Sequence, residues 1–420
     1  MATIKEALQN FNPWWSSKEI KITFSNRHVY HEIKKFIASK QIIALSGLRR
    51  VGKTTIMLKL AEELMKKDYL PENVIYFSFD EFKDAEISAI IKTYEEMSEK
   101  NLRSGKFLVL FDEVQKLNDW QNQLKTVYDL YGSSVKLVIS GSESLFIRRK
   151  SKESLAGRIF EFRVEPLSFT EFLSFKKFNP KPIGMHEKEL AKLFDKYILT
   201  QGFPELVDEE NKDYIKKYIN EGIVEKVVYS DIPKLFRISD PTVLESVLRP
   251  LLEEPGQLIE LSNWSKELGI SRQTLSLYLR YLEESFIVKK LYNFSKSRRK
   301  TERRLKKYYP AVVSEDLLFR QDDISRSHAF EWIVIRLLNV DFFWRDPYKN
   351  EVDAVAVEGD KISAFEVKYG KIDTDGLITF MQHFKINSGT IISKEAQKSM
   401  KVDGKNVEVT PAYRFFCNGS

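Results

Sequence analysis

Residues 47–54 read GLRRVGKT and stand between two apolar segments of different periodicity. The run before them, 42–45, is short and continuous, as in a buried strand, and the segment after them, 56–61, has helical spacing. A glycine-rich turn between a strand and a helix lets backbone N–H groups surround a phosphate group at the positive end of the helix dipole. The chain must therefore contain an α/β sheet in which this loop follows the carboxyl end of a strand.

The chemistry of this loop predicts that it binds a nucleoside triphosphate. Lys53 can reach the β- and γ-phosphate oxygens, while the hydroxyl group of Thr54 can ligate Mg²⁺. We expect ATP and Mg²⁺ as cofactors, Thr54 as a metal ligand, and a cofactor-binding set of Gly47, Leu48, Arg49, Arg50, Val51, Gly52, Lys53, Thr54 and Thr55.

Two carboxylates, Asp112 and Glu113, follow another apolar run at 107–111. The carboxyl end of a buried strand is where α/β sheets place their ligands. We expect Asp112 to hold the nucleotide's metal ion, and Glu113 to act as a catalytic residue that orients or deprotonates the attacking water. A third expected strand leads to Ser140, which could sense the γ-phosphate or could belong to a plain turn.

The composition limits the kind of protein that this chain can be. Its 420 residues suggest roughly two to four domains. Because no apolar stretch approaches the roughly 20 residues that cross a bilayer, we expect a cytoplasmic protein without a membrane segment. The single cysteine, Cys417, excludes an intrachain disulfide and a cysteine-based metal site. The net charge of +7 is modest for this length and does not by itself imply nucleic acid.

A helix-turn-helix pattern occupies residues 259–287, with Ser271 as the N-cap of its second helix. The outward positions of that helix include Arg272 and Arg280, which could face a DNA groove. The hairpin expected at 288–309 holds the most basic segment of the chain and would form a wing. DNA is therefore an expected partner, and the predicted contacts are Arg272, Arg280, Arg298, Arg299, Lys300, Arg303 and Arg304. The alternative is a packing or dimerisation module with a solvated basic hairpin.

The last third of the chain combines carboxylates with a lysine. Glu366 and Lys368 stand two residues apart on an expected strand and so share one of its faces. Asp353 can approach from the neighbouring strand, and Glu331 from a preceding helix. Such a set can bind Mg²⁺ or Mn²⁺ and assist phosphodiester hydrolysis, so we predict all four as catalytic residues, with Asp353 and Glu366 as ligands of a second metal ion. The alternative is an inactive docking domain in which Glu366 and Lys368 form a surface ion pair.

Six motifs occur in the order seen in a known family: GLRRVGKTT, LVLFDEVQ, SGSES, SLAGR, EPLSF and QGFPE. On these motifs the chain resembles AAA-type P-loop ATPases of archaea and bacteria, which are similar to STAND-like and initiator-like ATPases. Its last third resembles the PD-(D/E)xK nuclease fold that accompanies this family. The resemblance implies that Arg158 contacts phosphate charge, in its own chain or across a subunit boundary of a homo-oligomer, and that Gly202 and Pro204 lie near the base. Alternatively, Arg158 could cap a helix or pair with Glu161, and Pro204 could belong to a packed turn.

The expected fold class is α/β, in four parts: an AAA-type P-loop ATPase core over 1–165, a helical lid over 166–240, a winged helix with a basic wing over 241–310, and a PD-(D/E)xK nuclease-like α/β domain over 311–420. The expected function is ATP hydrolysis in which the nucleotide state serves to bind or act on DNA. The C-terminal domain could add a metal-dependent nuclease activity. The alternative is a nucleotide-dependent regulatory scaffold whose nuclease-like domain is inactive and binds a partner protein.

Overall fold

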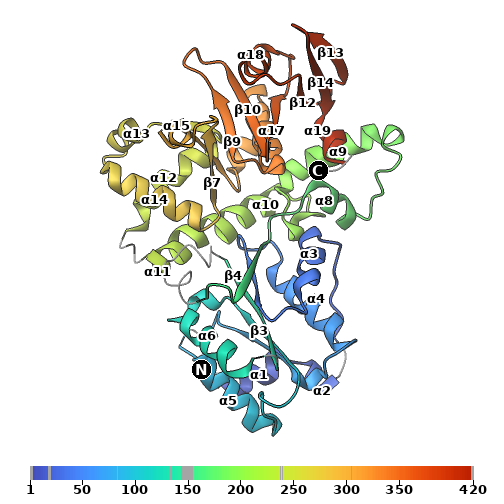
Figure 1. Ribbon diagram of the computed structural model, residues 1–420, viewed down its shortest axis with the longest axis vertical. Helices are drawn as coiled ribbons and strands as arrows, with labels where there is room; N and C mark the ends of the chain where they lie inside the picture. Colours follow the sequence, from blue (N-terminus) through green and yellow to red (C-terminus); the bar gives the residue numbers. More distant parts are fainter. Residues whose placement is uncertain are drawn as a thin grey trace. The chain divides into compact units, whose positions relative to one another are not determined.

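The computed structural model describes residues 3–17, 20–82, 84–132, 134–142, 155–236, 238, 240–303 and 305–417. Two compact units make up the chain, Met1–Pro166 and Leu167–Ser420 (Figure 1). The division falls one residue after the end that the sequence indicated for the ATPase core. None of the helices in the described ranges is long and apolar enough to span a lipid bilayer.

The first unit is built on a parallel sheet whose strands are β1 (Ile42–Ser46), β2 (Val74–Ser78), β3 (Phe107–Asp112), β4 (Val135–Gly141) and β5 (Ile159–Arg163). Their order in the sheet is β2-β3-β4-β1-β5, and all neighbours run parallel. This order places β4 directly beside β1, with β3 next to β4. The carboxyl ends of β3 and β4 therefore lie on the same side of the sheet as the loop that follows β1.

Most strands of this sheet are apolar, which suits a sheet that helices cover. Every residue of β1, β3 and β4 is buried, which is typical of a parallel sheet covered on both faces, whereas β5 at the edge is partly exposed. The helical elements are α1 (Ile4–Phe11), α2 (Trp14–Ser17), α3 (His28–Phe36), α4 (Lys53–Met65), η1 (Pro71–Asn73), α5 (Ile87–Ser98), η2 (Val114–Lys116) and α6 (Trp120–Tyr131).

The N-terminal segment is tied to β2, the strand at the other edge of this sheet. The side chain of Asn12 binds both backbone groups of Tyr76, accepting from its N–H at 2.6 Å and donating to its carbonyl at 2.9 Å. The indole N–H groups of Trp14 and Trp15 both donate to the carbonyl oxygen of Val74, at 3.0 and 2.9 Å. These bonds satisfy backbone groups of an edge strand that would otherwise be open to pairing with another chain.

The second unit contains a mixed sheet with the strand order β13-β14-β12-β11-β10-β9-β7-β8-β6. Its strands are β6 (Gln257–Ile259), β7 (Val288–Asn293), β8 (Lys306–Pro310), β9 (Phe342–Arg345), β10 (Glu351–Glu358), β11 (Lys361–Lys368), β12 (Ser388–Ser393), β13 (Lys398–Val402) and β14 (Lys405–Pro411). The hairpin β7-β8 is antiparallel, and β7 pairs in parallel with β9 through Tyr292↔Phe342 and Asn293↔Phe343. The segments 241–310 and 311–420, which the sequence separated, therefore share one sheet.

The second unit also contains a series of helical elements. They are α8 (Phe169–Phe175), η3 (Ile183–Met185), α9 (Glu187–Thr200), η4 (Pro204–Leu206), α10 (Lys212–Ile219), η5 (Asn220–Val224), η6 (Val227–Asp231), α11 (Ile232–Phe236), α12 (Pro241–Glu253), α13 (Leu261–Glu267), α14 (Arg272–Glu284), α15 (Arg298–Arg303), α16 (Glu315–Phe319), α17 (Asp323–Leu338), α18 (Asp375–Phe384) and α19 (Ala412–Cys417). Both η5 and η6 are π-helical turns.

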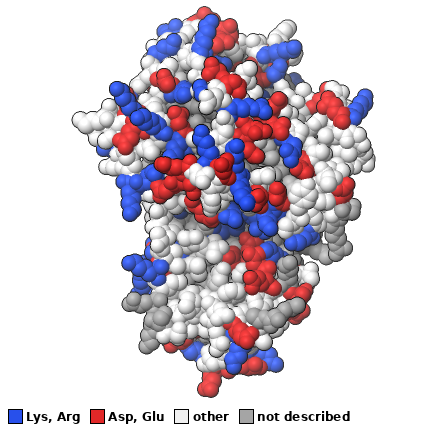
Figure 2. Space-filling model, turned by 180° about the vertical axis from the view of Figure 1, so that it is seen from behind, with Lys and Arg blue, Asp and Glu red and all other residues white. Residues whose placement is uncertain are grey.

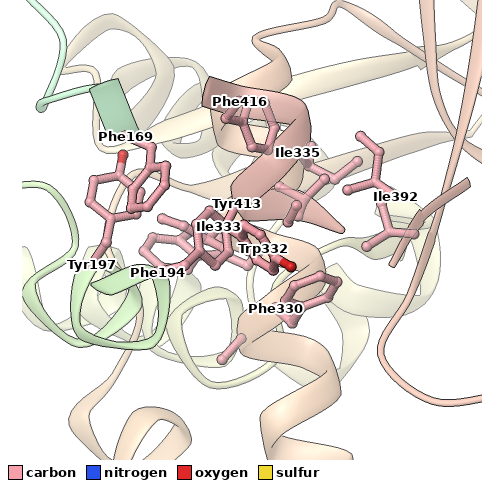
Figure 3. Packing of buried hydrophobic residues seen from close by; sticks show 14 of the residues in the cluster. Phe169, Phe194, Tyr197, Phe330, Trp332, Ile333, Ile335, Ile392, Tyr413 and Phe416 are labelled. Carbon is pink, nitrogen blue, oxygen red and sulfur yellow. The ribbon is translucent and has the colours of Figure 1, made fainter. Parts of the chain in front are cut away.

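The segment that the sequence indicated as a separate lid packs onto the C-terminal part of this unit. Phe169, Phe194 and Tyr197 belong to one buried cluster with residues of α17 and α19 (Figure 3). The ring of Phe194 stacks on that of Phe416 with centroids 6.4 Å apart and an interplanar angle of 3°. It also meets the edge of Phe330 at 6.3 Å. The lid segment is therefore part of the same compact body as the C-terminal strands.

The helix pair predicted in the middle of the chain is present as α13 and α14. The hydroxyl group of Ser271 accepts from the backbone N–H of Thr274 at 3.0 Å, as expected of an N-cap. Leu275 is buried on the inner face of α14, together with Leu279 and Leu282. The hairpin β7-β8 follows as expected, but its basic segment folds into the helix α15 between the two strands.

Candidate nucleotide site and a second charged cluster

The glycine-rich loop wraps around the side chain of Lys53. Gly52, with φ +95°, caps α4, and the buried ammonium group of Lys53 donates to the carbonyl oxygens of Gly47 at 3.0 Å and Leu48 at 2.9 Å. A Cβ atom added to Gly47 would lie only 2.2 Å from the carbonyl oxygen of Val164, so the backbone approach requires glycine. Residues 47–55 of the predicted cofactor-binding set belong to this loop and the first turn of α4.

Arg27 holds the loop in place, and sequence reasoning missed it. This arginine is 4% exposed; its Nη1 donates to the carbonyl oxygen of Val51 at 2.9 Å and its Nη2 to that of Glu165 at 2.6 Å. The guanidinium group thereby joins the phosphate-binding loop to the chain that leaves β5. No motif surrounds Arg27 in the sequence, and its second partner is 138 residues away.

Asp112 lies beside the loop and accepts hydrogen bonds from three hydroxyl groups. Thr54 donates to its Oδ2 at 2.6 Å, Tyr76 donates to the same oxygen at 2.9 Å, and Ser140 donates to Oδ1. Burial, together with the charge of Asp112, raises the pKa of Tyr76, so that its hydroxyl remains a donor. The oxygen atoms of Thr54 and Asp112 are the hard ligands that Mg²⁺ prefers, and they are adjacent. The residues present therefore fit the metal ion that accompanies a nucleoside triphosphate.

Glu113 is held by two side chains that the sequence analysis did not select. Its Oε2 accepts from the amide of Gln115 at 2.6 Å and from the hydroxyl group of Ser142 at 3.3 Å. Gln115 also donates to Ser142 at 3.0 Å, and the backbone N–H of Glu113 donates to Ser140 at 3.3 Å. The expected general base thus lies next to Asp112 with a defined orientation. The polar residues after β3 and β4 were the signal that could have identified Gln115 and Ser142.

The structure corrects one expected role of Arg158. It directly precedes β5, and its carbonyl oxygen accepts from the backbone N–H of Ile42 at the start of β1, at 2.8 Å. The phosphate-binding loop follows the other end of β1, so Arg158 does not contact that loop in its own chain. Its guanidinium group pairs with Asp129 at 3.1 Å and lies over the ring of Tyr128, and the alternative pair with Glu161 is not formed. A contact with phosphate charge across a subunit boundary stays a prediction.

Gly202 and Pro204 lie in the second unit, where the neighbourhood of Gly202 serves packing. The carbonyl oxygen of Gly202 accepts from Leu167 N–H at 2.7 Å, and a Cβ atom at this glycine would lie 2.8 Å from Leu167 O. The adjacent Gln201 exchanges two side-chain hydrogen bonds with the backbone of Val313, at 2.8 and 3.3 Å. The packed-turn interpretation accounts for these contacts, and a contact with the nucleotide base stays a prediction.

The four charged residues predicted in the C-terminal third do gather in one cluster. Lys368 pairs with Glu366 at 2.8 Å, and Asp353 accepts from the backbone N–H of Val367 at 2.8 Å. Burial and then the charge of Glu331 raise the pKa of Asp353, and burial and then the charge of Asp353 raise the pKa of Glu366. These carboxylates are therefore buried close to one another, and a cation beside them reduces their mutual repulsion.

That cation is Lys307, which the sequence analysis assigned to the wing. Its ammonium group contacts Glu351 and lies 4.0 Å from Glu331 Oε1 and 3.9 Å from Asp353 Oδ1. Burial lowers the pKa of Lys307, but the charges of Glu331, Asp353 and Glu351 outweigh burial and raise it. Two more residues complete the cluster: Tyr309 donates to Glu331 at 2.8 Å, and Arg345 pairs with Glu351 at 2.7 Å.

The predicted second metal ion does not fit this arrangement. Within the described ranges, no three His, Cys, Asp or Glu side chains are placed to hold a metal ion together. The physical reason is that the ammonium group of Lys307 lies among the carboxylates that the ion would need. Lys307 therefore opposes Mg²⁺ or Mn²⁺ at Asp353 in the arrangement observed, and the expectation that Asp353 and Glu366 bind such an ion stays a prediction.

The predicted nucleic-acid residues are exposed where the structure describes them. Arg272 and Arg280 lie on the outer face of α14, where Arg280 pairs with Glu284 at 3.0 Å, and Arg299 and Lys300 are exposed on α15. Arg304 lies outside the described residues, as do the side chains of Arg298 and Arg303. Over the second unit, the face in Figure 2 shows basic and acidic side chains interspersed, without a large area of one sign.

Comparisons with known proteins agree with the geometry of the first unit. A family model described as an AAA domain matches residues 39–173, and models of two domains of unknown function match residues 191–311 and 337–415. An uncharacterised protein of Haemophilus influenzae is 25% identical over 413 residues, which cover 92% of this chain and 97% of that protein. An uncharacterised protein of Methanocaldococcus jannaschii is 26% identical over 415 residues, which cover 89% of this chain and 84% of that protein.

Among solved structures, the Walker-type ATPase PABY2304 of Pyrococcus abyssi is similar over 70% of this chain and 96% of its own, with 17% identity and a TM-score of 0.42. DnaA of Aquifex aeolicus bound to AMPPCP is similar over 65% of this chain and 92% of its own, with 18% identity and a TM-score of 0.33. The matched family model spans the loop, β1 to β5 and the carboxylates Asp112 and Glu113. This chain therefore carries an AAA-type P-loop ATPase domain at residues 39–173.

Proposed function

We propose that this protein binds ATP with Mg²⁺ at the phosphate-binding loop and hydrolyses it. The observation that carries the proposal is the position of Asp112, which is hydrogen-bonded to Thr54 and Ser140 beside the loop that encloses Lys53. Thr54 and Asp112 would hold Mg²⁺, which neutralises phosphate charge when it is bound. The ammonium group of Lys53 would exchange its bonds to backbone carbonyls for bonds to the β- and γ-phosphate oxygens.

Glu113 is the residue best placed to orient the attacking water. Its carboxylate follows Asp112 directly, and a general base must lie within reach of the proton that it takes. Gln115 and Ser142 both donate to the same oxygen of this carboxylate, Oε2. The other carboxylate oxygen, Oε1, is the better candidate to accept from water, because neither of these two donors binds it.

The second unit supplies surfaces through which the nucleotide state would act on DNA. The exposed arginines of α14 and the exposed basic residues of α15 support phosphate contacts, since Lys and Arg side chains neutralise the backbone of nucleic acids. The helix pair α13–α14 has the order of a helix-turn-helix, which is the part of a winged helix that enters a groove. ATP binding and hydrolysis would then change the affinity of these surfaces for DNA.

An ATPase assay with single-stranded, duplex and branched DNA tests both parts. We expect turnover that requires Mg²⁺, that DNA stimulates, and that Lys53→Ala abolishes, while the exposed control Lys67→Ala, beyond the other end of α4, leaves turnover unchanged. Wild-type protein without turnover in any of these mixtures would refute the ATPase proposal. For DNA binding, joint replacement of Arg272, Arg280, Arg299 and Lys300 by Ala should remove a salt-sensitive affinity, and unchanged binding would refute the DNA proposal.

A second candidate function is favoured by the lysine inside the C-terminal cluster. A nucleotide-dependent regulatory scaffold needs no cleavage chemistry, and Lys307 lies among the carboxylates that a nuclease would use for metal ions. The two candidates share ATP hydrolysis and differ in the role of the second unit. The assay that separates them is DNA nicking in Mg²⁺ or Mn²⁺: activity lost in Asp353→Ala supports a nuclease, and its absence in wild-type protein supports the scaffold.

A further inference from the structure

The charged cluster of the second unit contains a cation that belongs to the chain itself. The side chain of Lys307 is 7% exposed, and its ammonium group is within 4.0 Å of carboxylate oxygens from three residues: Glu331, Glu351 and Asp353. The ammonium nitrogen of Lys307 lies 5.5 Å from the ring centroid of Phe343, which adds a cation–π contact. A buried ammonium group is stable only when it is paired, and here its partners are the acidic residues Glu331, Glu351 and Asp353.

Both oxygens of Asp353 lie near donors, whereas Glu366 has one buried oxygen, Oε2, without a hydrogen-bond partner among the described residues. Asp353 Oδ2 accepts from the backbone N–H of Val367, and Oδ1 is the oxygen nearest to Lys307. Glu366 Oε1 pairs with Lys368. A metal ion bound to Asp353 Oδ1 at the usual distance of about 2.1 Å would lie within about 6 Å of the ammonium group of Lys307, and the two positive charges would repel each other. Lys307 and a divalent ion therefore compete for Asp353.

The three carboxylates and the lysine come from separate parts of the unit. Lys307 lies on β8, Glu331 on α17, and Glu351 and Asp353 on β10. The β7-β8 hairpin is joined to the rest of the sheet through two backbone pairings with β9, so the ion pairs of Lys307 reinforce a short junction. Arg345 on β9 binds Glu351 and extends the ion pairs to a third strand.

We propose that Lys307 is the resident cation of this carboxylate cluster, which binds no divalent metal ion while the lysine is in place. Its ammonium group neutralises Glu331, Glu351 and Asp353 and ties the β7-β8 hairpin to β10 and α17. The inference deepens the scaffold candidate for the second unit. It does not depend on ATP hydrolysis, because all of its residues lie outside the first unit.

Mn²⁺ binding to the full-length chain without nucleotide tests this proposal, with the free ion measured by electron paramagnetic resonance. Lys307→Met keeps most of the side-chain volume and removes the charge. We expect it to bind one Mn²⁺ more than the wild-type protein, and we expect Lys307→Met/Asp353→Asn to lose that ion. The matched control is Lys306→Met, since the ammonium group of Lys306 lies 5.8 Å from the ring centroid of Tyr292 and outside the cluster; it should bind as many ions as wild type.

Two results would overturn the proposal. One is a folded Lys307→Met protein that gains no Mn²⁺ site. The other result needs no lysine variant. If wild-type protein binds a Mn²⁺ ion that Asp353→Asn protein does not bind, the metal ion occupies Asp353 although Lys307 is present. If Lys307→Met does not fold, the proposal is tested by comparing wild-type and Lys307→Arg proteins with Asp353→Asn. All three should bind the same number of Mn²⁺ ions. Failure of the ATPase assay with these results intact would refute the proposed nucleotide function alone.

Discussion

Replacing Gly47 by alanine tests how the phosphate-binding loop is held against β5. The glycine has φ +147°, and a Cβ atom built on it lies 2.2 Å from the carbonyl oxygen of Val164. The backbone on both sides is paired, since Val164 N–H donates to the carbonyl oxygen of Ser46 at 2.7 Å. The new methyl group could move away from Val164 only if the loop and the segment that follows β5 separated.

The size of the effect follows from two contributions. A side chain at positive φ costs about 1–2 kcal/mol, and crowding of a methyl group against backbone costs about 1–3 kcal/mol more. We therefore expect Gly47→Ala to lower the free energy of unfolding of the first unit by about 2–5 kcal/mol. Reaching an ordinary contact of 3.4 Å from Val164 O also requires a shift of about 1 Å in the loop. A displacement of that size in a binding site can reduce catalysis about 100-fold.

Gly157→Ala is the matched control, because Gly157 has φ +73° but no atom of the described residues within 4 Å of its added Cβ. This variant carries the conformational cost without the overlap, so we expect a loss of about 1–2 kcal/mol and normal ATP binding. Urea unfolding followed by circular dichroism, and binding of a fluorescent ATP analogue, would be measured on both full-length variants. Equal stability and equal nucleotide affinity of Gly47→Ala and Gly157→Ala would refute the close approach of the loop to Val164.

Three further predictions concern the same unit. Thr54→Val keeps the shape of the side chain and removes the oxygen that binds Asp112, so ATP turnover should fall at least about tenfold; titration with Mg²⁺ checks this, and wild-type turnover would contradict it. Arg27→Met removes the donor to the carbonyl oxygens of Val51 and Glu165, and at about 1–3 kcal/mol for each lost partner it should destabilise the unit by about 2–4 kcal/mol. Urea unfolding measures this loss, and a change under about 1 kcal/mol would count against a stabilising role of Arg27. Burial alone would raise the pKa of Glu62, but hydrogen bonds from Lys59 and Lys66 lower it to about 2. Its stabilisation is therefore present above pH 4.5 and lost as the pH falls toward 2, and Glu62→Gln should flatten the acid limb of a thermal unfolding profile.

Local sequence patterns predicted those parts of the molecule in which neighbouring residues act together. The loop at 47–54 lies between a strand and a helix as expected, and Ser271 caps the second helix of the predicted pair. Both predictions rest on residues within one or two turns of each other. The strand that ends at Asp112 was predicted for the same reason, since a continuous apolar run is sufficient to indicate a buried parallel strand.

The sequence did not reveal two buried cations, one beside the phosphate-binding loop and one in the C-terminal carboxylate cluster. Arg27 binds a carbonyl oxygen 138 residues away, and Lys307 meets carboxylates on β10 and α17. Neither residue belongs to a motif, and a basic residue in a basic segment is most simply interpreted as solvated. The shared sheet of the second unit was missed for a related reason. Two backbone pairings between β7 and β9 join segments that look independent in the sequence, and no local pattern indicates such a junction.

The buried aspartates Asp112 and Asp353 differ in what surrounds them, and this difference determines which of the two can take a metal ion. Asp112 accepts hydrogen bonds from the hydroxyl groups of Thr54, Tyr76 and Ser140, which are neutral donors. Hydroxyl oxygens can also turn from donating to the carboxylate to ligating a cation beside it. Asp353 instead lies 3.9 Å from the ammonium group of Lys307, which opposes its charge and cannot act as a metal ligand. The first site is therefore suited to Mg²⁺, whereas the second becomes a metal site only when the lysine is removed.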